Sequence, residues 1–229
     1  MDVTIIIQNK DYGCYLEECI QSVLKQHTDY EFEVIGIDAG STDNSVEIYK
    51  GYPEISLLET KGEQAKCLNE ALVFAKGKYF SWINSDDIYD LNFVQDCINT
   101  FKLFPEAAMV YGNVRLFAAD GRSSISNPPP FDRRIYIQGN QIYQVGVMLH
   151  KERVIDAGKF NEKYRSPIDW ELYLRLSREH PLVKMESIVG MNRMHGKNLS
   201  VRPDWKDIIW NEYLEVKKIE EEYERQHKN

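Results

Sequence analysis

Strand-like and helix-like segments alternate four times within about the first 90 residues of this chain. Each strand-like segment is a short run rich in β-branched and aromatic residues, and helical segments with apolar residues at helical spacing separate them. Parallel strands joined by helices form right-handed crossovers, so the sequence predicts an α/β fold with a mostly parallel sheet covered by helices on both faces. The predicted strands are residues 3–7, 32–37, 55–58 and 79–83.

The second half of the chain has a different pattern. Residues 123–130 contain three consecutive prolines among serines and an asparagine, and they are predicted to form an irregular loop that acts as a flap. The other predicted elements are a helix over 92–104, a strand over 109–113, an apolar run over 145–149, a short helix from Glu152, a helix from Ile168 and a helix from Trp205 to the end.

Composition excludes several functional classes. With 229 residues and 43% hydrophobic residues, the chain can bury the core of one large domain. Its net charge of -8 argues against a nucleic-acid partner, because phosphate contacts need a basic face. No apolar run reaches the roughly 18 residues that a membrane span needs, and no signal peptide opens the chain. We therefore expect a protein that is soluble or peripherally attached to a membrane.

The four cysteines predict a cytoplasmic location. They form no CxxC pair and have no histidine at zinc-ligand spacing, which is typical of reduced thiols that serve as small core residues. They are Cys14, Cys19, Cys67 and Cys97.

Two adjacent carboxylates, Asp86 and Asp87, follow the strand predicted over 79–83. Like charges side by side repel each other and resist burial unless a cation lies next to them. The pair therefore predicts a metal-assisted site at the carboxyl end of a strand. The alternative is that one of them caps the next helix.

Polar residues follow two other strands as well. Gln8 and Asn9 come after the first strand, and Asp38 ends the second. Ligands of open α/β sheets bind outside the carboxyl ends of the strands, so these side chains are candidates for the same site. Asp169 lies near the start of a later helix, where an ordinary first-turn charge or cap is the alternative to a functional role.

The order of these motifs resembles the family 2 glycosyltransferases, which have the GT-A fold, over nearly the whole chain to about residue 200. The later motifs, which include Ser200, are similar to the acceptor-side half of that family. The matching segments are 3–7 (VTIII), 15–26 (YLEECIQSVLKQ), 38–43 (DAGSTD), 75–79 (AKGKY), 84–87 (NSDD), 158–162 (GKFNE), 169–175 (DWELYLR) and 193–195 (RMH) with Ser200.

The resemblance implies roles for the donor side of the site. Asp38 is expected to contact the base or ribose of a nucleotide-sugar donor, and Gln8 and Asn9 to line the nucleoside pocket. Asp86 is expected to contact the donor ribose or sugar. Asp87 is expected to be the direct ligand of Mn²⁺ or Mg²⁺, which neutralises charge on the leaving diphosphate.

His195 is expected, by the same resemblance, to be a further metal or phosphate ligand. A surface or partly buried histidine without a ligand role is the alternative. Asp169 matches the carboxylate that removes a proton from the acceptor hydroxyl. A single displacement of this kind inverts the anomeric centre, and the sequence nominates no separate nucleophile for a retaining reaction.

The resemblance also predicts how the chain is organised. One GT-A domain is expected over residues 1–204, with a nucleotide-sugar-binding half over 1–113 and an acceptor-binding half over 114–204. The helix over 205–229 is expected to pack on this domain, with a homodimer contact or an interfacial helix as alternatives.

The predicted function is inverting transfer of a sugar, most commonly UDP-linked hexose or N-acetylhexosamine in this family, to a saccharide or lipid-linked saccharide acceptor. Cell-surface polysaccharide or glycolipid synthesis is the expected setting. One alternative is a nucleotidyltransferase that makes sugar nucleotides, but residues 8–13 hold a single glycine where that class has a glycine-rich phosphate loop. The other is a non-catalytic protein of the same fold.

Overall fold

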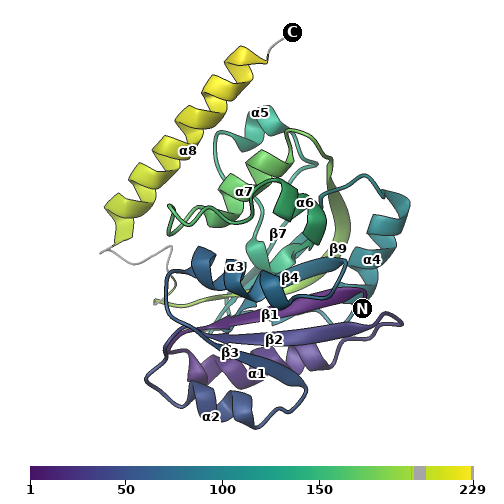
Figure 1. The fold of residues 1–229 in the computed structure, drawn as a ribbon, viewed down its shortest axis with the longest axis vertical. Coiled ribbons are helices and arrows are strands. Elements are labelled where there is room, and N and C mark those ends of the chain that lie inside the picture. Colours follow the sequence, from purple (N-terminus) through teal and green to yellow (C-terminus); the bar gives the residue numbers. More distant parts are fainter. Residues whose placement is uncertain (197, 199–204, 228–229) are drawn as a thin grey trace.

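A computed structural model describes residues 1–196, 198 and 205–227 of the chain (Figure 1). Its centre is one sheet with the strand order β3-β2-β1-β4-β8-β6-β9-β5, and β7 pairs with β6 beside this path. The strands are β1 (Val3–Asn9), β2 (Phe32–Asp38), β3 (Ile55–Glu59), β4 (Tyr79–Asn84), β5 (Ile88–Tyr89), β6 (Met109–Ala118), β7 (Ser123–Ser126), β8 (Val147–His150) and β9 (Leu182–Met194).

The first four strands predicted from the sequence are confirmed, and β1, β2 and β3 run parallel with β4. Both β1 and β4 are buried on the two faces of the sheet, which explains their continuous apolar character. Each strand extends at least one residue beyond its predicted end, because the polar residue there still pairs in the ladder. Asn9 thereby lies opposite Asp38, and Gln8 opposite Asn84.

Helices cover both faces of this sheet and enclose two hydrophobic cores (Figure 1). Side chains that alternate along β1 enter opposite cores: Ile6 faces one core, and Ile5 and Ile7 face the other. On the Ile5 side lie α1 (Gly13–Leu24), α2 (Ser45–Lys50) and α4 (Phe93–Leu103), and on the Ile6 side lie α3 (Gln64–Phe74), α6 (Lys151–Asp156) and α7 (Ile168–Leu176).

The second half of the chain adds an antiparallel portion to the sheet. β8 runs antiparallel to both β4 and β6. The long strand β9, which the sequence analysis did not predict, runs parallel to β6 and antiparallel to β5. Its apolar residues are interrupted by Lys184, Glu186 and Asn192, so the pairing with β6 rather than its own pattern decides its structure.

The prediction of an irregular loop over residues 123–130 is wrong for its first half. Residues Ser123–Ser126 form β7, which pairs antiparallel with β6 in a register that places Ser126 opposite Val114. Serine is compatible with an extended backbone when a neighbouring strand supplies hydrogen bonds, and the prolines begin only at Pro128. The short helix α5 (Arg133–Tyr136) follows and was also not predicted.

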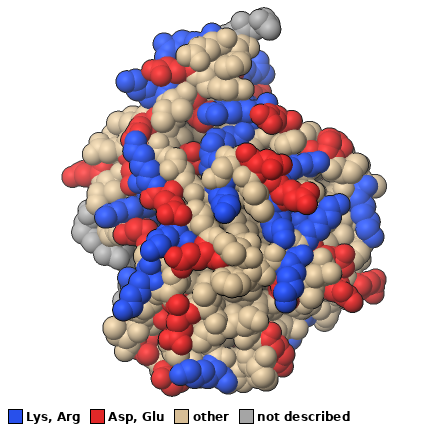
Figure 2. Space-filling model, viewed as in Figure 1, with Lys and Arg blue, Asp and Glu red and all other residues tan. Residues whose placement is uncertain are grey.

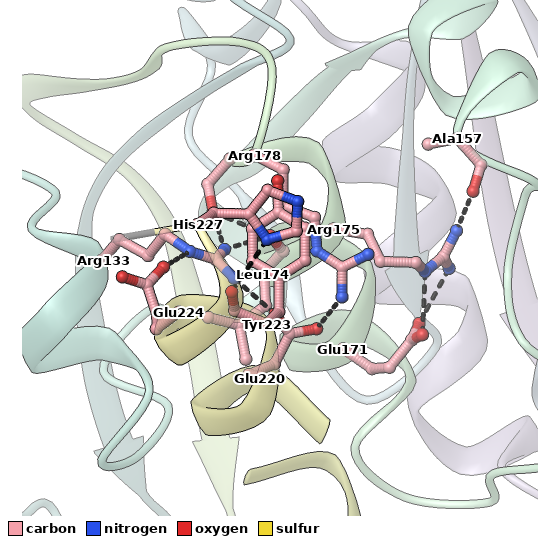
Figure 3. A network of polar contacts seen from close by, with 11 residues as sticks. Arg133, Ala157, Glu171, Leu174, Arg175, Arg178, Glu220, Tyr223, Glu224 and His227 are labelled. Atoms are coloured by element: carbon pink, nitrogen blue, oxygen red, sulfur yellow. Dashed lines mark hydrogen bonds and ion pairs between the residues drawn. The ribbon is translucent and has the colours of Figure 1, made fainter. Parts of the chain in front are cut away.

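The C-terminal helix α8 (Lys206–Gln226) packs on the domain beside α5 and α7, as predicted (Figure 1). Val216 joins the core there, and Glu220 is 1% exposed. Figure 3 shows Glu220 between the guanidinium groups of Arg133 and Arg178. Ser200 and the predicted domain boundary at residue 204 lie outside the described residues.

Opposite charges are intermingled over the face of the molecule shown in Figure 2, where Lys and Arg side chains lie among Asp and Glu side chains. Within the part of the chain that the structure describes, no helix combines the length and the apolar character that a membrane crossing requires.

Candidate active site

The carboxyl ends of β1, β2 and β4 meet at one edge of the sheet, and the side chain of Asn9 connects them. Its Nδ2 donates to Asp38 Oδ1 at 3.4 Å and to Ser41 Oγ at 3.2 Å, while its Oδ1 accepts from Ser85 Oγ at 2.6 Å. Asn9 is only 1% exposed. It therefore holds three strand ends together.

Asp38 is buried in the same network. Its Oδ2 accepts hydrogen bonds from the backbone N–H groups of Gly40 and Ser41, at 3.1 and 2.8 Å, and so shapes the turn after β2. Gly40 has φ +84, a conformation that glycine adopts without strain. Of the predicted donor-binding residues at these strand ends, Gln8 has a buried Oε1 that no described residue hydrogen-bonds.

Asp86 and His195 lie side by side, although 109 residues separate them in the chain. His195 Nε2 lies 3.0 Å from Asp86 Oδ2, and both side chains remain partly exposed. The imidazole also packs against the rings of Tyr12 and Tyr15, with centroids 5.6 and 5.2 Å away. Asn198 contributes a further hydrogen bond to Asp86 Oδ2 at 3.3 Å.

Asp87 is only 2% exposed and contacts β9. Asn192 Nδ2 donates to its two oxygens at 3.0 and 3.2 Å, and the backbone N–H of Arg193 donates to Oδ1 at 3.0 Å. Burial, and after it the charge of Asp86, raise the pKa of Asp87 well above its usual range. Neither aspartate caps the next helix, because the N-cap of α4 is Asn92.

Arg193 links the end of β9 to the residues after β4 and to α1. Its Nε donates to the backbone carbonyl of Asp86 at 3.0 Å, and its guanidinium pairs with Glu18 and lies over the ring of Tyr15. Arg193 belongs to one of the motifs that resemble the family, but the sequence predicted no role for it or for Asn192. Because β9 was not predicted, nothing in the sequence placed these two residues beside Asp86 and Asp87.

Asp169 lies in the first turn of α7 and remains partly exposed. The N-cap is Pro167, and Asp169 Oδ2 accepts a hydrogen bond from Asn140 Nδ2 at 2.9 Å. Burial is the main cause that raises the pKa of Asp169, to about 6, while hydrogen bonds from the Trp170 backbone and Asn140 oppose it. At neutral pH the carboxylate is therefore ionised and still basic enough to accept a proton.

A carboxylate and an imidazole are suitable ligands for Mn²⁺. Asp86 and His195 already lie at hydrogen-bond distance from each other. Among the described residues, no group of three or more His, Cys, Asp or Glu side chains is close enough to hold a metal ion. The pair therefore fits a divalent cation that takes its remaining ligands from a bound molecule and from water.

Comparisons with known proteins identify the family of this chain. The family model described as glycosyl transferase family 2 matches residues 2–155. A chondroitin synthase from Pasteurella multocida (strain Pm70) is 29% identical over 201 residues, which are 83% of this chain and 20% of that protein. This chain thus spans about a fifth of the length of that synthase.

Solved structures show the same fold at lower identity. A crystal structure of S. aureus TarS residues 1–349 in complex with UDP-GlcNAc has a TM-score of 0.68 at 18% identity and covers 86% of this chain and 60% of that chain. The mannosyltransferase PcManGT from Pyrobaculum calidifontis, in complex with GDP-Man and Mn²⁺, has a TM-score of 0.66 at 14% identity and covers 99% and 76%. These likenesses confirm the GT-A fold, and because the family model matches well over half of the residues, the chain belongs to glycosyl transferase family 2.

Proposed function

We propose that this chain transfers a glycosyl group from a nucleoside-diphosphate sugar to a hydroxyl group of a saccharide acceptor, with inversion at the anomeric carbon. The observation that carries the proposal is the pairing of Asp86 with His195 just beyond the carboxyl ends of the parallel strands, together with Asp169 in the first turn of α7 as a separate basic carboxylate. Ligand sites lie at this edge in open α/β folds.

The proposed donor is a UDP-linked hexose or N-acetylhexosamine. Two of the similar proteins support this choice: the TarS structure contains UDP-GlcNAc, and a relative is named a chondroitin synthase. Gln8 is proposed to contact the nucleoside directly, because its buried Oε1 has no partner among the described residues. Asn9 and Asp38 are proposed to shape the same pocket through the turn that they hold.

Asp86 and His195 are proposed to hold Mn²⁺ or Mg²⁺. This reverses the roles expected from the sequence, in which Asp87 was the direct ligand and Asp86 contacted the donor. The reason is that both oxygens of Asp87 are buried against Asn192, whereas Asp86 faces His195 and solvent. When bound, the cation neutralises negative charge on the departing diphosphate. Asp87 then keeps the end of β9, and with it His195, in place.

Asp169 is proposed to be the general base. Its carboxylate takes the proton of the acceptor hydroxyl while the hydroxyl oxygen forms a bond to the anomeric carbon, and the bond from that carbon to the diphosphate breaks. One displacement of this kind inverts the configuration. A pKa of about 6 suits this role, since the group is ionised at neutral pH and accepts a proton readily.

The proposed acceptor is a growing polysaccharide or a lipid-linked saccharide, and its support is the chondroitin synthase relative. Attachment to the cytoplasmic face of a membrane and the formation of a homodimer stay predictions. The donor and the acceptor are proposed for this chain alone, because the chondroitin synthase is about five times as long as the segment that it shares with this chain.

The test is calorimetric titration with UDP, GDP, dTDP and CDP, each with and without Mn²⁺. We expect one nucleoside diphosphate to bind in a Mn²⁺-dependent way, and Asp86→Asn to weaken this binding at least tenfold. Asp169→Asn should bind normally and lose transfer. Asp156→Asn is the matched control, because Asp156 is exposed at the end of α6. Normal Mn²⁺-dependent binding in Asp86→Asn would contradict the metal assignment, and transfer by Asp169→Asn would contradict the assigned base.

A further inference from the structure

We propose that Asn140 is a positioning residue that fixes the carboxylate of Asp169 for proton transfer, an inference that rests on the proposed function of Asp169 as the base. Asn140 lies in the loop after α5, and Asp169 lies 29 residues further along the chain, in α7. The two side chains meet through one hydrogen bond, from Asn140 Nδ2 to Asp169 Oδ2 at 2.9 Å.

The neighbours of Asn140 determine the orientation of its amide. Its Oδ1 accepts from the backbone N–H of Ile142 at 3.0 Å and from the hydroxyl of Tyr136 at 2.6 Å. A backbone N–H can only donate, so it must face the amide oxygen rather than the amide nitrogen. The NH₂ group consequently faces Asp169, and a flipped amide would place an N–H against the N–H of Ile142.

The loop that carries Asn140 is docked on α7 by a second bond. Trp170 Nε1 donates to the backbone carbonyl of Tyr136 at 2.8 Å, and the Tyr136 ring is 4% exposed. From the other side, α8 contributes Tyr213, whose ring stacks on Trp170 with centroids 4.6 Å apart. Lys217 of α8 also donates to Gln138 Oε1 at 2.7 Å. The loop that carries Asn140 is thus held by both α7 and α8.

The groups that face Asp169 are otherwise neutral at neutral pH. They are the phenols of Tyr136 on α5, Tyr173 on α7 and Tyr213 on α8. Burial, and after it the charge of Asp169, raise the pKa of each of these phenols. No cation of the described residues forms an ion pair with Asp169. A cation would lower the basicity of the carboxylate, whereas an amide orients it with a smaller effect on its charge. The neutral amide of Asn140 can therefore orient the carboxylate of Asp169 and still leave it basic enough to accept a proton.

The test uses Asn140→Ala, Asn140→Asp and Tyr136→Phe, the last of which removes only the hydroxyl that orients the amide. The control is Asn99→Ala, because Asn99 is exposed on α4 and accepts a hydrogen bond from Tyr30. The first readout needs no acceptor. The ¹³C carboxyl resonance of Asp169, identified by its loss in Asp169→Asn, is titrated with pH in each variant.

We expect the midpoint of this titration to rise by about one pH unit in Asn140→Ala, because the buried carboxylate loses a donor. The rise should be larger in Asn140→Asp, where a second carboxylate adjoins the first, and smaller in Tyr136→Phe. Asn99→Ala should match the wild type. A midpoint that is unchanged in both Asn140 variants would overturn the proposal, and Tyr136→Phe supplies the readout if neither Asn140 variant folds.

The second readout is transfer to chondroitin oligosaccharides from UDP-N-acetylgalactosamine, measured against pH. We expect kcat to fall about tenfold to a hundredfold in Asn140→Ala, while the donor KM and the Kd of UDP with Mn²⁺ stay unchanged. Transfer by Asp169→Asn would overturn the proposed function together with this inference. Loss of transfer in Asp169→Asn with full transfer in Asn140→Ala would overturn this inference alone.

Discussion

The side-chain amide of Asn192 contacts both carboxylate oxygens of Asp87, at 3.0 and 3.2 Å, and joins the end of β9 to the end of β4. The two residues lie 105 positions apart in the chain. Because this contact occupies Asp87, the neighbouring Asp86 is the carboxylate that meets His195. Two adjacent aspartates therefore have different surroundings, because β9 covers only the side chain of Asp87.

Removal of the Asn192 amide should destabilise the fold. In Asn192→Ala the buried carboxylate of Asp87 loses one of its donors, and we expect the free energy of unfolding to fall by about 1–3 kcal/mol. Urea denaturation measures this change. Asn99→Ala, which removes an exposed hydrogen bond, should change it by less than about 1 kcal/mol. Equal losses in the two variants would show that Asn192 does not stabilise Asp87.

Replacement of His195 should weaken metal-dependent binding of the nucleoside diphosphate. We expect the Kd of the diphosphate in the presence of Mn²⁺ to rise about tenfold to a hundredfold in His195→Ala, since one metal ligand is lost. Without Mn²⁺, the wild type and His195→Ala should bind the diphosphate with the same affinity. His27→Ala is the control, because His27 is exposed and hydrogen-bonds through its backbone N–H. Unaltered Mn²⁺ dependence in His195→Ala would exclude the histidine as a ligand.

The transfer rate should depend on the ionisation of Asp169. Its pKa is raised to about 6, so the fraction of enzyme with an ionised base is near one at pH 8 and decreases below pH 6. We expect kcat/KM for the acceptor to fall about tenfold for each pH unit below this value. A pH profile of transfer at saturating Mn²⁺ measures this decrease in kcat/KM. A rate that stays constant down to pH 4.5 would exclude a base with this pKa.

Asp169→Asn should stabilise the protein at neutral pH although it abolishes transfer. The pKa of this group is about 6 in the folded state, above its ordinary value of 3.8, so the wild-type protein loses stability as the pH rises through 6. The variant lacks this loss and should be about 1–3 kcal/mol more stable at pH 8. Below about pH 4 the difference should vanish. Chemical denaturation of both proteins at pH 4 and pH 8 measures the size and the sign of this difference in unfolding free energy.

The contact between α8 and the rest of the chain depends on Glu220. Its carboxylate is almost fully buried and pairs with Arg133 and, at 2.7 Å, with Arg178. Glu220→Gln leaves these two cations without their shared partner, and we expect a loss of about 3–5 kcal/mol in unfolding free energy. Glu222→Gln, at a half-exposed position of the same helix, should cost less than about 0.5 kcal/mol. A small effect at both positions would mean that α8 is held mainly by its apolar face.

Local sequence patterns were sufficient for the strands β1 to β4 and for the helices between them. Their burial on both faces requires long apolar runs, and such runs are visible without any knowledge of the partners. The strand β9 was not visible in this way. Its pattern is broken by polar residues, and it is extended because β6 and β5 offer it hydrogen bonds. The same reason explains why the serine-rich residues 123–126 form β7 against expectation.

The sequence by itself determined the class of the fold, the family and the group of candidate residues, because strand-helix alternation and the order of short motifs are properties of the chain. Only the tertiary structure decided how Asp86 and Asp87 differ, and which residue holds Asp169. Asn192, His195 and Asn140 reach these carboxylates from elements far away in the sequence. Long-range strand pairing and helix docking create these contacts, and a local pattern of residue types carries no information about such partners.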